Sequence, residues 1–157
     1  MSTRSRIGYL FRSRDGGQKV ISVYCHSDGY PSYVGRILKD HYGTPEKIVR
    51  LMMLGDISML GTEPADCPDM WDYQSPVYQA VSSLPDWNVC RTYKGRGDTD
   101  CGARLSNGVK AMVEMLGEAY CYVFKDGRWY VAGLSGEDEV KYTEVGEAIE
   151  EERAKNR

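Results

Sequence analysis

Residues 119–133 contain the sequence FKDGRW, a β-hairpin signal that strongly restricts how the surrounding chain can fold. A two-residue Asp126-Gly127 loop favours a type I′ turn, because both central residues of that turn need a positive φ. The turn fixes the register of the two strands and places Phe124 opposite Trp129, an aromatic pair that stabilises a sheet. The sequence therefore predicts an antiparallel hairpin over 119–133.

Residues 6–25 carry a second hairpin signal near the start of the chain. Two runs rich in β-branched and aromatic residues, 6–12 and 18–25, flank a turn that contains Gly16 and Gly17. Such runs around a glycine turn are typical of an antiparallel hairpin.

Helix signals follow the first hairpin. Pro31 suits a first helical turn because its φ is already helical, and apolar residues recur at helical spacing through 31–42. Thr44 then offers an N-cap hydroxyl and Gly55 a stop, so a second helix is predicted over 45–54. Helical spacing returns near 109–116, and an acidic C-terminal helix is predicted over 145–157.

Together these elements predict an α+β fold, with an antiparallel sheet built from the two hairpins and helices packed on it. The 157 residues are expected to form a single domain, 1–157. The side chains predicted to be buried are Val34, Ile37, Leu38, Ile48, Leu51, Met112, Val113, Leu116, Phe124 and Trp129.

Charge and cysteine content argue against several classes of protein. The net charge is −3, divided into +5 for residues 1–50 and −8 for residues 51–157, and a dedicated DNA-binding protein usually has a stronger basic balance. Five cysteines without C-x-x-C spacing argue against a disulfide framework and against a zinc finger. Because no apolar run approaches the ~20 residues of a membrane span, the protein is expected to be soluble and cytoplasmic. No metal and no cofactor are expected.

Residues 62–104 are the least regular part of the chain. Pro64, Pro68, Pro76 and Pro85 interrupt any long element, so an irregular and mobile region is predicted. Near its end, Lys94 and Arg96 lie in a charged loop of the kind that closes over a ligand and supplies positive charge to phosphates.

Two stretches carry a resemblance to known proteins. One is YCHSDGYPSYVGRIL at 24–38, with its continuation through HY at 41–42, TPE at 44–46 and LGDI at 54–57; the other is YVFKDGRWYV at 122–131. They resemble a family of small, uncharacterised proteins encoded by bacteriophages and conjugative elements. The resemblance leaves out the middle of the chain. It implies a non-structural accessory product that acts inside an infected bacterial host cell, and it implies no reaction.

The turn between the first hairpin and the first helix gathers polar and aromatic side chains. A helix start exposes backbone N–H groups that bind anions, and Arg36 lies one helical turn beyond Ser32. A guanidinium, aromatic rings and backbone N–H groups together suit a phosphate with a stacked base. The residues predicted to bind a small anionic, nucleotide-like ligand are His26, Asp28, Tyr30, Ser32, Tyr33, Arg36, Lys94 and Arg96.

A plainer interpretation of the same turn stays open. Asp28 or Ser32 would cap the helix, while Tyr30 and Tyr33 would pack on the sheet.

The sequence favours a non-enzymatic protein, because it contains neither a G-x-S-x-G motif, nor a P-loop, nor a two-His zinc motif. The leading hypothesis is a phage or mobile-element protein that counters a host defence by binding a small anionic ligand or a host defence protein. The alternative is a small nucleotide-processing enzyme with His26 as general base, oriented by Asp28. Tyr-rich hairpins and a charged terminal helix often lie at homodimer interfaces, so a homodimer also stays open.

Overall fold

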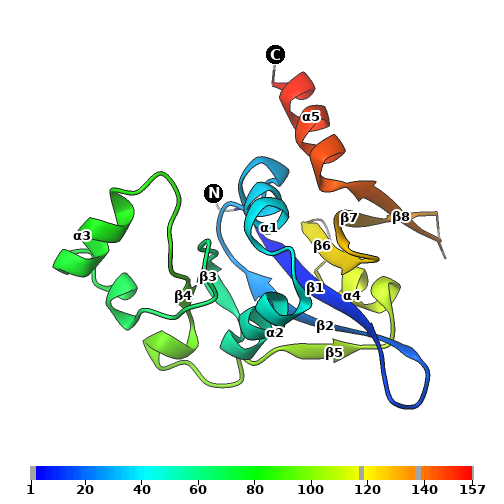
Figure 1. The fold of residues 1–157 in the computed structure, drawn as a ribbon, viewed down its shortest axis with the longest axis horizontal. Helices are drawn as coiled ribbons and strands as arrows, with labels where there is room; N and C mark the ends of the chain where they lie inside the picture. Colours follow the sequence, from blue (N-terminus) through cyan, green and yellow to red (C-terminus); the bar gives the residue numbers. More distant parts are fainter. Residues whose placement is uncertain (1–2, 117–118, 137–138, 157) are drawn as a thin grey trace.

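The computed structural model describes residues 3–116, 119–136 and 139–156. The described residues form an eight-stranded sheet with helices on both faces (Figure 1). The strands are β1 (Ser5–Arg12), β2 (Gln18–Cys25), β3 (Ile57–Met59), β4 (Arg91–Thr92), β5 (Arg104–Ser106), β6 (Tyr120–Lys125), β7 (Arg128–Ser135) and β8 (Glu139–Glu144). The helices are α1 (Arg36–His41), α2 (Pro45–Leu54), α3 (Pro76–Ser82), α4 (Val109–Leu116) and α5 (Val145–Lys155), with short helical turns η1 (Pro31–Gly35), η2 (Pro68–Trp71) and η3 (Lys94–Arg96).

Both predicted hairpins are confirmed. β1 pairs with β2, and β6 pairs with β7 in the predicted register, with Phe124 opposite Trp129. Asp126 has a φ of 53° and Gly127 a φ of 80°, the positive values that a type I′ turn needs.

The expectation of an antiparallel sheet is correct only within the hairpins, because the whole sheet is mixed. The strand order is β4-β3-β2-β1-β6-β7-β8, and β5 also pairs with β2. The two hairpins join through β1 and β6, which run parallel, and β2 and β3 are parallel as well. A turn signal fixes how the strands within one hairpin pair, but it says nothing about which strand of the next hairpin lies beside them.

The sheet separates two hydrophobic clusters. On one face η1, α1, α2 and α5 cover Ile7, Tyr122 and Phe124, and on the other face α4 covers Val20 and Val123. Neighbouring residues of a strand point to opposite faces, so β6 contributes to both clusters. Gly8 permits the close approach of α4, since a Cβ there would lie 2.5 Å from the Met112 sulfur.

The helix signals and the predicted buried residues are confirmed where the structure describes them. The Thr44 hydroxyl accepts a hydrogen bond from the Lys47 backbone N–H, and Gly55 ends α2 with a φ of 76°. The residues found buried as predicted are Val34, Ile37, Leu38, Ile48, Leu51, Met112, Val113, Phe124 and Trp129. The side chain of Leu116 is not among those that the structure describes, so its predicted burial stays a prediction. The last helix ends at Lys155, with Asn156 as its C-cap, and is therefore shorter than the predicted 145–157.

We expect Leu38→Ala to lower the free energy of unfolding by ~2–5 kcal/mol, because Leu38 is fully buried and its truncation leaves a cavity. Urea unfolding followed by circular dichroism measures this loss. Met53→Ala on α2 is the matched control, since Met53 is 74% exposed and its truncation should change stability by less than ~0.5 kcal/mol. Equal effects of the two substitutions would contradict the placement of α1 against the core.

Candidate functional site

A segment that we call the arm, residues 62–89, leaves the sheet after β3 and returns to it at β4 (Figure 1). It includes η2 and α3, so the region expected to be irregular contains short helices. Of the seven described residues of α3, none is buried, and within the whole arm only Met70 and Ser75 are buried. The arm therefore has almost no hydrophobic core of its own.

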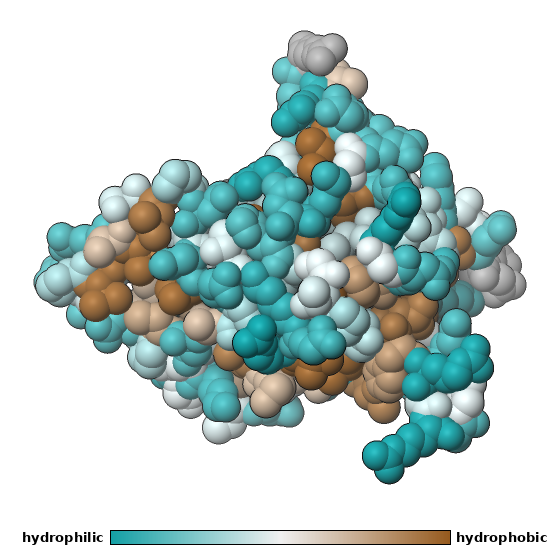
Figure 2. Space-filling view, in the orientation of Figure 1, coloured by the Kyte–Doolittle hydropathy of each residue, from teal (hydrophilic) through white to brown (hydrophobic). Residues whose placement is uncertain are grey.

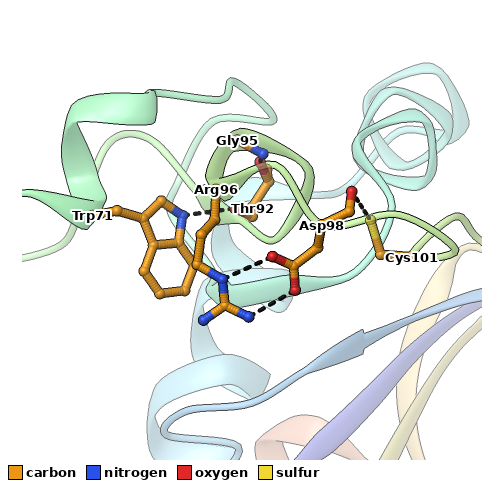
Figure 3. A network of polar contacts seen from close by, with 6 residues as sticks. All are labelled: Trp71, Thr92, Gly95, Arg96, Asp98 and Cys101. Carbon is orange, nitrogen blue, oxygen red and sulfur yellow. Dashed lines mark hydrogen bonds and ion pairs between the residues drawn. The ribbon is translucent and has the colours of Figure 1, made fainter.

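The base of the arm is held by backbone and indole hydrogen bonds. The Thr62 N–H donates to the Trp87 carbonyl at 2.6 Å, and the Cys90 N–H donates to the Ala65 carbonyl at 2.7 Å. The Trp71 indole N–H donates to the carbonyl of Thr92 on β4 at 2.8 Å (Figure 3).

Two arginines complete this attachment through the Trp71 ring. The guanidinium carbons of Arg91 and Arg96 each lie 4.7 Å from the ring centroid, within the range of cation–π attraction. Arg91 also donates to the Ser58 hydroxyl at 3.0 Å, and no ion pair to it is present among the described residues. Figure 3 shows the Arg96 side chain beside Trp71 and joined to the Asp98 carboxylate.

The tip of the arm, Tyr73 to Leu84, exposes apolar side chains. Tyr73 is 62% exposed, and Val77 and Leu84 are each 42% exposed. Figure 2 shows a hydrophobic patch over this end of the molecule, which Figure 1 identifies as α3. Tyr73 packs edge-on against Tyr78, and Tyr78 packs in the same way against Trp87, so the exposed ring of Tyr73 belongs to an ordered aromatic chain.

All charged side chains of the arm are acidic. Residues 62–89 contain no Lys, Arg or His, and their five acidic residues are Glu63, Asp66, Asp69, Asp72 and Asp86. Glu63 pairs with Lys47, and Asp86 pairs with Arg36. Within the described chain, Asp69 and Asp72 have no ion-pair partner; they accept hydrogen bonds from the Ser75 hydroxyl and the Gln74 N–H respectively.

The site residues predicted near the helix start lie around η1 but do not form one pocket. Tyr30 and Ser32 line a groove of about 580 Å³ against α5, and Ser32 and Arg36 line a smaller one of about 230 Å³. Tyr33 packs against the core, where burial raises the pKa of its hydroxyl to about 12. Neither Asp28 nor Ser32 makes the predicted capping bond among the described contacts; instead the Ser32 N–H donates to the Glu152 carboxylate at 3.3 Å.

Arg36 is engaged by a carboxylate from the arm. Its two terminal nitrogens donate to the two oxygens of Asp86 at 3.2 and 2.7 Å. The hydrogen bond and the charge of Arg36 lower the pKa of Asp86, and the same pair raises the pKa of Arg36. This bidentate pair connects α1 to the end of the arm.

Lys94 and Arg96 lie on η3, beside the arm. Because Arg36 faces Asp86 and Arg96 faces Asp98, a phosphate would have to displace an aspartate to reach either guanidinium. The anionic, nucleotide-like ligand stays a prediction, and these two ion pairs are the obstacles that it would meet.

The described contacts give little support to acid–base catalysis at His26. The Nδ1 atom of His26 lies 2.7 Å from the Tyr24 hydroxyl, and no bond to Asp28 is among the described contacts. Cys25 next to it is fully buried, and burial raises its pKa to about 12, so the thiol stays protonated at neutral pH.

All five cysteines are free, and the described residues contain no group of three or more His, Cys, Asp or Glu side chains placed to hold a metal ion. Among the described residues, no helix is long and apolar enough to cross a membrane.

Comparisons of the chain with protein-family models, with curated proteins and with solved structures gave no match.

Sequence reasoning missed Trp71, Arg91 and Asp86, which hold the arm. A signal for the arm was present in the composition of residues 62–89, where five acids and four Trp or Tyr residues occur without one basic residue. The pairing of Arg36 with Asp86 had no such signal, because it joins residues 50 positions apart.

We expect Asp86→Asn to lower the free energy of unfolding by ~0.5–1 kcal/mol at pH 7, the size of a partly exposed ion pair. Because the pKa of Asp86 is lowered in the folded protein, this contribution is present above the ordinary carboxyl pKa and is lost as the pH falls through the folded value. Urea unfolding of both proteins between about pH 7 and pH 3 should show the two curves converging at low pH. Glu150→Gln, in an exposed pair with Arg153, is the control with almost no expected effect. A difference that does not change with pH would contradict an electrostatic origin.

Proposed function

We propose that this chain is a non-enzymatic binding protein that grips a partner protein through the tip of the arm, and that the partner presents a basic, partly apolar surface. The observation that carries the proposal is the tip itself. It exposes Tyr73, Val77 and Leu84 and has no charged residue of its own, while the arm that carries it contains five acidic residues and no basic residue.

The apolar part of the tip supports a protein partner. Exposed apolar side chains gathered on one protruding element are typical of interaction sites, and Tyr and Trp are enriched among the residues that dominate binding energy. The base of the arm is already fixed by Trp71, Arg91 and the Arg36–Asp86 pair. A fixed base reduces the ordering cost that binding would otherwise carry.

The charge of the arm determines the kind of partner. Asp69 and Asp72 precede the tip and have no ion-pair partners among the described residues, so they would attract Lys and Arg side chains. The same carboxylates would repel the phosphates of a nucleic acid. From the resemblance to phage and conjugative-element proteins, we further propose that the partner is a defence protein of the host bacterium.

Site-directed cross-linking tests this function. A photo-reactive phenylalanine analogue is placed at Val77 in one variant and at Met53 in another, because both positions are exposed but only Val77 lies on the arm. We expect a bacterial extract to give a cross-linked protein at Val77 that is missing at Met53. The same products at both positions, or none at Val77, would count against the proposal.

The partner identified by cross-linking is then purified by itself, and its affinity for variants of the chain shows which side chains bind it. Tyr73→Ala should weaken the affinity by at least ~30-fold, the effect of losing a hot-spot residue worth ~2 kcal/mol. Asp69→Asn with Asp72→Asn should weaken it less and make it less sensitive to salt, since the attraction at the rim is screened by ions. Met53→Ala is the control and should leave the affinity unchanged. An affinity that survives Tyr73→Ala would place the contact elsewhere on the protein.

A further inference from the structure

The groove of about 580 Å³ lies between the start of η1 and α5, well separated in sequence from the arm. Figure 1 shows α5 rising from the end of β8 beside the helical segment at α1, and α5 contacts η1 directly. The side chains that determine its chemistry are Tyr30 and Tyr120 on one side and Glu151, Glu152 and Lys155 of α5 on the other.

The acidic wall of the groove is held in place by the packing of α5. Val145 and Ala148 are buried against the sheet layer, which fixes the face of the helix that carries the glutamates. Glu152 accepts a hydrogen bond from the Ser32 N–H at 3.3 Å, so its carboxylate lies at the start of η1. The Glu152 carboxylate therefore occupies the position at the Ser32 N–H that an anionic ligand would need.

The aromatic wall lies close to this carboxylate. Burial raises the pKa of the Tyr120 hydroxyl, and the negative charge of Glu152 and the neighbouring Tyr30 hydroxyl raise it further. Tyr120 also stacks on Tyr122, with 6.3 Å between the ring centroids, which fixes the orientation of its ring. Carboxylates beside aromatic faces are the combination that recognises a cation, by charge pairing and by attraction to the ring faces.

We propose that the groove between η1 and α5 is a binding site for a small organic cation, one that carries an alkylammonium or a guanidinium group. Glu151 and Glu152 supply the counter-charge, and Tyr30 and Tyr120 supply the apolar and aromatic surface. Lys155 also lines the groove and offsets part of the negative charge of the two glutamates. This site is independent of the arm, so its failure in a test leaves the proposed function untouched.

Calorimetric titration of the whole chain tests the site with two probes. Spermidine represents a free polyamine, and Nα-acetyl-arginine amide represents the side chain of a protein. Binding of either probe supports the site and identifies which source the groove prefers. If neither probe binds at millimolar concentration, the proposal is overturned.

Substitutions on α5 and at the start of η1 show where the cation binds. Glu152→Gln removes the charge but keeps an oxygen that can accept from the Ser32 N–H, and it should weaken binding by about tenfold or more. Tyr30→Ala removes an exposed ring and should weaken binding by a smaller factor. Glu147→Gln is the matched control, because it removes the same charge from the same helix but does not line the groove, and it should leave the affinity unchanged. An equal loss in Glu147→Gln and Glu152→Gln would show attraction to the acidic helix in general and would overturn the site.

Discussion

The hydrogen bond from the Tyr122 hydroxyl to the Gly29 carbonyl, 2.6 Å long and buried, connects the centre of the sheet to the helical layer. Tyr122 lies on β6, which runs beside β1, and Gly29 lies in the loop that leads from β2 into η1. The Gly29 N–H donates to the Thr3 carbonyl at 2.8 Å, so both backbone groups of this residue are tied to the sheet side. A buried carbonyl left without its donor costs ~1–3 kcal/mol. This attachment fixes the loop that leads into η1, and the buried side chains Val34, Ile37 and Leu38 then hold η1 and α1 against the same face of the sheet.

The sheet layer and the arm are stabilised in different ways. The sheet and the helices packed on it bury large apolar side chains on both faces, whereas the arm buries almost nothing and relies on Trp71, two guanidiniums and one bidentate ion pair. Contacts of this kind fix the direction of a segment without hiding its side chains from solvent. That is why Tyr73 at the tip of the arm can pack against Tyr78 and still be exposed to solvent.

Local chemistry made part of this fold predictable. The Asp126-Gly127 turn, the Thr44 cap and the spacing of Leu38 are decided by residues close in sequence, and the structure confirms each of them. The parallel pairing of β1 with β6 joins segments more than a hundred residues apart, and no turn signal encodes it. The candidate site also combines contacts that local sequence predicts with contacts from distant segments that it does not. Tyr30, Ser32 and Arg36 lie around the helix start, as their closeness in sequence requires, but the carboxylates that contact Ser32 and Arg36 come from distant segments, Glu152 and Asp86.

Those two carboxylates also change the chemistry expected at the helix start. The excess of positive charge in residues 1–50 meets the excess of negative charge in the rest of the chain through Arg36 with Asp86 and Lys47 with Glu63. The acidic residues of the arm and of the groove then exceed the basic side chains beside them, which include Arg91 at the arm and Lys155 in the groove. A phosphate gains little from a guanidinium that already donates two hydrogen bonds to a carboxylate, whereas a cation gains from carboxylates that lack such a partner. The two proposals therefore rest on the same physical rule, which would favour a basic protein at the arm and a small organic cation at the groove.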